Sequence, residues 1–275
     1  MSDVLIGELL SVAMFVATIG AVLAGYPVAF TLAGVGLAFA TLGIACGVFD
    51  VAILSALVGR YFGTMTNETL VAVPLFVFMG IMMEQANLME RLFDAVQKML
   101  SRVRGSLYLA VMFVATIFAA ATGIVGASVT ILGIMAGKSM IRSGYDVKLS
   151  SGLIAAGGTL GILIPPSIML VVMGPVLEVP VTTLFAAAIV PGLLLALMFT
   201  GYAMIRCLIN PALGPALPKE MQPTSMREVW LQFLQGLVPP AALVLAALGS
   251  IVFGLATPTE GAACGAIGAL LLTMA

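Results

Sequence analysis

The residues of this chain that could do chemistry are hydroxyl side chains set among small residues in long uncharged stretches. Thr122 and Ser128 lie in the small-residue run 119–128, and Thr159 and Ser167 lie in the glycine- and proline-rich run 157–167. A cation such as sodium is held within a membrane by hard oxygen ligands, and unwound backbone supplies carbonyl oxygens that a regular helix keeps bonded internally. These hydroxyls and their neighbouring carbonyls are therefore candidate cation ligands.

A second kind of chemistry follows from the tandem prolines Pro165 and Pro166. A helix broken there would point the amino terminus of its second half, with its partial positive charge, into the middle of the membrane. Residues from Ser167 onward could then face the carboxylate of an anionic substrate. Neither role needs a charged side chain, and the stretch 149–177 contains none.

The same glycine- and proline-rich stretches also allow a structural role, and an intramembrane enzyme is a further alternative. Glycine-rich membrane segments also serve close helix packing, and a proline can merely kink a helix. An intramembrane enzyme has no support, because the chain contains no His, no HExxH motif and no paired Asp within its apolar stretches. A purely structural membrane subunit stays open as an alternative.

Composition places the candidate residues in a membrane protein. The 275 residues are 62% hydrophobic and 8% charged, with a formal net charge of −1, so nucleic acid is not an expected partner. Several uncharged stretches exceed the ~20 residues that a helix needs to cross the bilayer. We therefore expect an all-α integral membrane protein with many spans. Isolated Cys46, Cys207 and Cys264 are expected to be buried packing residues.

The stretch 105–137 predicts a re-entrant hairpin. It contains 33 uncharged residues between Arg104 and Lys138, fewer than the ~40 that two full crossings require. A single crossing would leave basic clusters on both sides of the membrane, against the positive-inside tendency. A hairpin that enters and leaves from the cytoplasmic side satisfies both constraints, with its tip at 119–128.

The stretch 149–177 predicts a broken helix. Consecutive prolines remove two amide donors and clash with the preceding turn, so we expect an unwound segment at 157–167. Further helices are expected at 4–24, 28–45, 69–83, 87–100, 181–205 and 230–255, and from 261 onward, with a cytoplasmic loop at 206–228. Helix 87–100 is amphipathic and suits the membrane surface. This topology places the amino terminus outside the cytoplasm.

Four motifs resemble one transporter family. They are GYPVAF at 25–30, VPLFVFMG at 73–80, GGTLGILIPPS at 157–167 and ATPTE at 256–260. Together they resemble the large membrane subunit, DctM-like, of tripartite ATP-independent periplasmic (TRAP) transporters. The resemblance implies an elevator-type, sodium-driven importer of organic acids in the cytoplasmic (inner) membrane of a bacterium or archaeon.

The resemblance also implies which residues form the site. Sodium would be bound by residues of the hairpin tip and the broken helix, namely Thr122, Gly123, Ser128, Gly158, Thr159, Gly161 and Pro165. Substrate would be bound by Thr122, Pro166 and Ser167. No cofactor is implied beyond Na⁺ as the coupling ion.

The domain organisation and partners follow from the same resemblance. Residues 1–104 would form scaffold spans and an interfacial arm helix, 105–177 half of the transport domain, 178–255 connecting spans and a cytoplasmic loop, and 256–275 the start of a truncated second repeat. An alignment of Pro27 with Pro258 gives a weak echo of such an inverted repeat. The expected partners are a small membrane subunit (DctQ-like), a periplasmic substrate-binding protein (DctP-like) and an organic-acid substrate. An ion-coupled anion carrier without a binding protein is the alternative within transport.

Overall fold

The computed structural model describes residues 3–101, 103–123, 125–216 and 226–274, and it divides the chain into two compact units, Met1–Asn67 and Glu68–Ala275. Every regular element in these described ranges is a helix. Five helices are long and apolar enough to cross a membrane, and they lie at Leu5–Leu23, Val28–Ala45, Glu68–Gln85, Val181–Ile209 and Met226–Val252. The expectation of an all-α, multi-span membrane protein is confirmed at this level.

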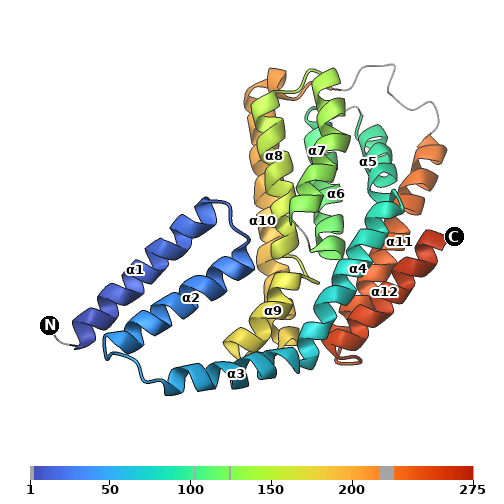
Figure 1. Ribbon diagram of the computed structural model, residues 1–275. Helices are drawn as coiled ribbons and strands as arrows, with labels where there is room; N and C mark the ends of the chain where they lie inside the picture. Colours follow the sequence, from blue (N-terminus) through green and yellow to red (C-terminus); the bar gives the residue numbers. More distant parts are fainter. Residues whose placement is uncertain (1–2, 102, 124, 217–225, 275) are drawn as a thin grey trace. The chain divides into compact units, whose positions relative to one another are not determined.

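The first unit contains α1 (Asp3–Leu23), α2 (Val28–Ala45) and α3 (Ala52–Met65). A tight turn joins the first two helices. Gly25 has a positive φ of 88°, which a residue without a Cβ adopts easily, and Pro27 precedes the first residue of α2. Figure 1 shows α1 and α2 as an antiparallel pair.

The second unit contains all the candidate site residues. In chain order its elements are η1 (Glu68–Val71), α4 (Ala72–Gln85), α5 (Leu88–Met99), α6 (Ser106–Thr122), α7 (Val125–Arg142), α8 (Val147–Thr159), η2 (Leu160–Ile162), α9 (Ile168–Leu177), α10 (Val181–Ile209), η3 (Pro211–Leu213), α11 (Met226–Val252) and α12 (Pro258–Met274). Helices α6 and α7 form a hairpin that packs beside α8 (Figure 1).

Helix α10 extends beyond its predicted end. The sequence placed a loop at 206–228, whereas α10 continues to Ile209. Cys207 explains the extension, because its side chain is only 1% exposed and so belongs to the packed face of the helix. The helix ends before Pro211, which has no amide hydrogen to donate. Residues 217–225 of the predicted loop lie outside the described residues.

Helix α5 has the predicted amphipathic pattern, but its apolar face is covered by protein. Leu92, Phe93 and Val96 are each at most 2% exposed. The backbone of Leu92 approaches Gly236 of α11 so closely that a Cβ on that glycine would lie 2.9 Å from the Leu92 Cα. The amphipathic pattern predicted that this face lies in the membrane surface, whereas the structure buries it against α6 and α11.

The helix ends around η3 are tied together by hydrogen bonds. The carbonyl of Gly214 accepts from the backbone amide of Gly105 at 2.9 Å, and the carbonyl of Leu213 accepts from the Asp146 amide at 3.1 Å. The Tyr108 hydroxyl donates to the same Leu213 carbonyl at 2.8 Å. These bonds hold the start of α6, the start of α8 and the end of α10 at one end of the unit.

The expectation for the cysteines is correct for one of the three. Cys207 is buried, whereas Cys46, which follows the end of α2, and Cys264 of α12 are exposed. Isolated apolar spans cannot show which helix face meets a neighbour, so sequence could not separate these cases.

Candidate functional site

The predicted break in the helix is present. Helix α8 ends at Thr159, one short 3-10 turn follows, and α9 begins at Ile168. The peptide bond between Pro165 and Pro166 is cis. Because neither proline carries an amide hydrogen, the carbonyls of Gly161 and Ile162 lose the donors that a continuous helix would provide. The break therefore frees carbonyl oxygens for other partners.

Ser167 closes the break from within. Its side chain is 0% exposed, and its hydroxyl donates a 2.6 Å hydrogen bond to the carbonyl of Ile162. Ser167 also occupies the N-cap position of α9, where its side chain makes no capping hydrogen bond. The hydroxyl thus satisfies one freed carbonyl instead of an amide of the first turn of α9.

The turn of the α6–α7 hairpin meets the start of α9. Gly123, between the two hairpin helices, has a φ of +60°. A Cβ at this position would lie 3.3 Å from the backbone nitrogen of Ile168 and 3.3 Å from its Cγ1. Only a glycine permits both the left-handed backbone and this close approach. The hairpin turn and the broken helix are thereby neighbours in space.

A second close approach joins the hairpin to the helix before the break. A Cβ on Gly158 of α8 would lie 2.9 Å from the backbone nitrogen of Val129 and 3.0 Å from its Cα. The preceding residue in α7, Ser128, is only 2% exposed. The seam between α7 and α8 therefore brings the Ser128 region of the hairpin beside Gly158.

The remaining predicted site residues divide into three groups. Gly161, Pro165 and Pro166 are buried in the break. Thr159 is exposed, and its hydroxyl donates to the Ala156 carbonyl of its own helix at 2.7 Å, so the structure does not bring it to Ser167. The side chain of Thr122 lies outside the described part of the chain.

Gly192 also shapes the site, although the sequence analysis did not select it. A Cβ on this residue of α10 would lie 3.0 Å from Ile164 Cγ1 and 3.5 Å from the Leu163 carbonyl oxygen. Because Gly192 has no side chain, the unwound segment can pack closely against α10. The signal in the sequence was the pair Pro191-Gly192 within an apolar span, since a glycine in a helix interior often marks a close backbone approach.

The site offers oxygen atoms and a helix amino terminus. Among the described residues, no group of three or more His, Cys, Asp or Glu side chains could hold a metal ion. Serine hydroxyls and backbone carbonyls are hard ligands that suit a monovalent cation. The first turn of α9 carries partial positive charge that favours an anion.

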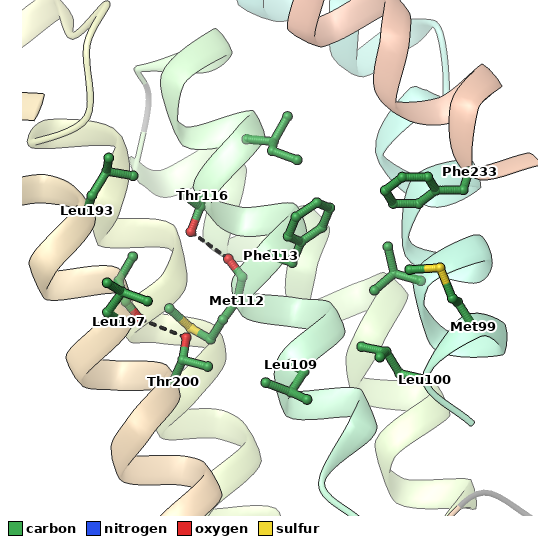
Figure 2. A pocket seen from close by; sticks show the side chains of 13 residues that line it. Met99, Leu100, Leu109, Met112, Phe113, Thr116, Leu193, Leu197, Thr200 and Phe233 are labelled. Carbon is green, nitrogen blue, oxygen red and sulfur yellow. Dashed lines mark hydrogen bonds between the residues drawn. The ribbon is translucent and has the colours of Figure 1, made fainter. Parts of the chain in front are cut away.

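An apolar cavity of about 490 Å³ lies elsewhere in the unit, between α5, α6, α10 and α11. Figure 2 shows its lining, which includes Phe113, Leu197 and Phe233 and none of the nine predicted site residues. The hydroxyls of Thr116 and Thr200 donate to carbonyls of their own helices, each at 2.7 Å. The cavity therefore presents hydrocarbon and has no group suited to a small anion or cation.

Comparison with known proteins identifies relatives of the whole chain. Residues 13–275 match the family described as "Tripartite ATP-independent periplasmic transporter, DctM component". The chain is 36% identical to the C4-dicarboxylate TRAP transporter large permease protein DctM of Pseudomonas aeruginosa, over 80% of this chain and 50% of that protein. It is 33% identical to the sialic acid TRAP transporter large permease protein SiaM of Vibrio cholerae, over 92% of this chain and 56% of that protein.

A third relative is named DctMQ, whereas the first two are named DctM and SiaM. The chain is 30% identical to the isethionate TRAP transporter permease protein DctMQ of Oleidesulfovibrio alaskensis, over 90% of this chain and 37% of that protein. The chain spans about half the length of the first two relatives. These relatives are named as transporter permeases and not as enzymes.

Proposed function

The chain belongs to the DctM component family of the tripartite ATP-independent periplasmic transporters, and from this premise we propose that it acts as a membrane permease subunit of a sodium-coupled, binding-protein-dependent importer of organic acids. It is a multi-pass membrane protein with a transport role. The observation that carries the proposal is the approach of Gly123 to Ile168, because it joins the hairpin turn to the amino terminus of α9.

Sodium would be bound by oxygens of the hairpin and the break. Ser128 and the backbone around Gly123 would contribute from the hairpin, while the backbone from Gly158 to Pro165 would contribute from the other side. Thr122 and Thr159 belong to the proposed set through their backbone carbonyls. Hard oxygen ligands from unwound backbone provide this coordination without a buried charge.

The substrate would bind where Pro166 and Ser167 lead into α9. A carboxylate placed there would accept from first-turn amides and would be stabilised by the helix dipole, by roughly 0.3–1 kcal/mol at an exposed end and more when partly buried. The named substrates of the relatives include a C4-dicarboxylate, sialic acid and isethionate. All three are organic anions, which agrees with this chemistry.

The proposed transport cycle is an elevator movement. The α6–α7 hairpin, entering and leaving the membrane from one side, would move together with α8 and α9 against scaffold helices. The basic helix ends would face the cytoplasm, and the amino terminus would face the periplasm. A small DctQ-like subunit and a periplasmic DctP-like binding protein would complete the transporter, and the designation DctMQ of one relative supports the first of these partners.

Uptake into proteoliposomes tests this proposal. The full-length permease containing this chain is reconstituted with its small subunit, and the binding protein is supplied outside with radiolabelled C4-dicarboxylates, sialic acid and isethionate. We expect uptake that requires both an inward sodium gradient and the binding protein. The matched control replaces sodium with potassium at equal ionic strength.

Two other outcomes would redirect the assignment. Sodium-driven uptake that is unchanged when the binding protein is omitted would identify a binding-protein-independent carrier. Uptake that persists equally in potassium would reject sodium coupling.

A further inference from the structure

A second groove, of about 670 Å³, lies between the start of α8 and the end of α10, next to η3. At the end near η3 it is lined by the polar side chains of Asp146, Lys148, Tyr202 and Arg206 together with Leu213. The rest of its lining includes Leu149, Gly152, Leu153 and Phe199. The groove therefore has a charged mouth and an apolar floor, and none of the nine predicted site residues lines it.

The mouth of the groove carries an excess of positive charge. Two cations, Lys148 and Arg206, stand against the single carboxylate of Asp146, which gives a net charge of +1 for these groups. The Asp146 carboxylate already accepts a 2.8 Å hydrogen bond from the Leu149 amide at the start of α8. A hydrogen bond within the chain therefore already offsets part of the negative charge of Asp146.

Arg206 is held at the mouth by Tyr202. Its guanidinium lies 5.8 Å from the centroid of the Tyr202 ring and donates a 3.2 Å hydrogen bond to the Tyr202 hydroxyl. In the described part of the chain, neither Arg206 nor Lys148 forms an ion pair with a carboxylate. A guanidinium has five N–H donors, so most of them stay available to a phosphate.

The floor of the groove leaves open space beside Gly152. A Cβ at Gly152 would meet nothing within 4 Å. Leu153, only 4% exposed, and the partly buried Phe199 form hydrocarbon walls that continue from the cations along α8 and α10. An apolar channel that begins at a pair of cations matches an amphiphile with an anionic head and a hydrocarbon chain.

We infer that this groove binds an anionic phospholipid, with its phosphate at Lys148 and Arg206 and an acyl chain along Gly152 toward Phe199. The bilayer itself supplies such lipids to any groove that opens laterally among membrane helices. Basic pockets between membrane helices bind acidic head groups when they face the cytoplasmic leaflet. A free phosphate would use only the mouth and would gain nothing from the apolar floor.

Native mass spectrometry of the purified protein tests the inference. Phosphatidylglycerol and phosphatidylcholine with identical acyl chains are offered in equal amounts, and the lipid retained per protein is measured. We expect preferential retention of phosphatidylglycerol. Lys148→Gln and Arg206→Gln should each weaken that retention about fivefold, which corresponds to ~1 kcal/mol for each cation near a membrane surface.

Two further variants separate the groove from general surface charge. Gly152→Phe should fill the floor and weaken retention while both cations remain. Arg142→Gln removes an exposed cation at the end of α7 that does not line the groove, and it should leave retention unchanged. Size-exclusion profiles and thermal unfolding midpoints confirm that each variant is folded.

The contrary results are equally definite. Equal retention of the two lipids, or an equal loss in Arg142→Gln, would overturn the inference. Displacement of the lipid by inorganic phosphate or by glycerol phosphate at matched concentration, or retention unaffected by Gly152→Phe, would show an anion site without an acyl-chain floor and would likewise overturn it.

Discussion

Gly123 at the turn of the α6–α7 hairpin lies against Ile168, the first residue of α9, because a Cβ on the glycine would stand 3.3 Å from the isoleucine nitrogen. The two residues are 45 positions apart in the sequence. Their contact places a left-handed turn beside the amino terminus of a half-helix.

Gly123→Ala should weaken the site and the fold. An L-residue at a left-handed φ costs roughly 1–2 kcal/mol, and the added methyl group also presses on Ile168. We expect a lower thermal unfolding midpoint in detergent. A loss of ~1.4 kcal/mol from the site would lower the apparent sodium affinity of the whole permease about tenfold. Gly137→Ala in α7 is the matched control, because nothing lies within 4 Å of its Cβ. Equal effects of the two substitutions would contradict the assigned role.

Gly158→Ala should separate α7 from α8. The new methyl group would stand 2.9 Å from the backbone nitrogen of Val129, which cannot rotate away as a side chain would. Overpacking of this kind costs about 1–3 kcal/mol.

The comparison variant for Gly158→Ala is Gly152→Ala in the same helix. Nothing lies within 4 Å of a Cβ at Gly152, and alanine favours a helix over glycine by ~1 kcal/mol, so this change should be neutral or stabilising. Thermal unfolding midpoints of both variants provide the measurement. A stable Gly158→Ala protein would show that the α7–α8 seam is looser than the structure indicates.

Ser167→Ala should destabilise the break. The substitution leaves the Ile162 carbonyl without the 2.6 Å hydroxyl bond, and loss of such a hydrogen bond costs about 0.5–1.5 kcal/mol. The exposed Ser151, whose hydroxyl bonds to the Lys148 carbonyl of its own helix, supplies the control variant Ser151→Ala. Unfolding midpoints report the structural effect.

A sodium titration of uptake then separates two roles of Ser167. If its hydroxyl also contacts the substrate, Ser167→Ala raises the KM for the organic acid, while the sodium dependence measured at saturating substrate stays the same. A variant that is destabilised yet has an unchanged KM would limit Ser167 to a structural role.

Glu260 predicts a pH dependence at the start of α12, before the apolar span that begins at Gly261. The backbone amide and the hydroxyl of Thr257 donate to its carboxylate at 2.8 and 2.9 Å, and these bonds lower the pKa of Glu260 below its ordinary value. A lowered folded-state pKa contributes stability above the unfolded-state pKa, and this contribution is lost as the pH falls through the folded-state pKa.

The stability difference between the wild type and Glu260→Gln should therefore be constant near neutral pH. It should shrink toward zero in acid, as the wild-type carboxylate becomes protonated. Thermal unfolding at a series of pH values in detergent measures this difference. A difference that stays constant down to strongly acidic pH would rule out the charged cap as its source.

The sequence indicated where the helical hairpin and the interruption near Pro165 would lie, but not that Pro165 and Pro166, rather than Pro239 and Pro240, would end a helix. The uncharged length of 105–137 excluded two full crossings, and Pro165 with Pro166 removed the amide donors that a continuous helix needs. Both features depend on local covalent chemistry and on bilayer thickness, which apply before any tertiary contact forms. The turn between α6, which ends at Thr122, and α7, which begins at Val125, is shorter than the predicted tip, and α7 extends beyond 137 to Arg142. The interruption between α8 and α9 falls within the predicted segment 157–167.

Tandem prolines alone do not decide where a helix breaks. Pro239 and Pro240 lie inside α11, which continues from Met226 to Val252. The break at Pro165 is stabilised by its neighbours. Gly192 has no side chain, so Leu163 and Ile164 can pack closely against α10. The Ser167 hydroxyl donates a hydrogen bond to the Ile162 carbonyl. Such partners come from distant positions, so only tertiary packing determines which proline pair unwinds the chain.

Composition and local pattern were thus enough to predict a helical membrane protein with a helical hairpin and an interrupted helix. The ion-binding role of the candidate residues stays a prediction. Tertiary structure decided which helix faces meet. It covered the apolar face of α5 with protein, turned Thr159 toward its own helix and brought Gly123 to Ile168. The reason is that periodicity identifies an apolar face but carries no information about which of several equally apolar neighbours, or the lipid, will cover it.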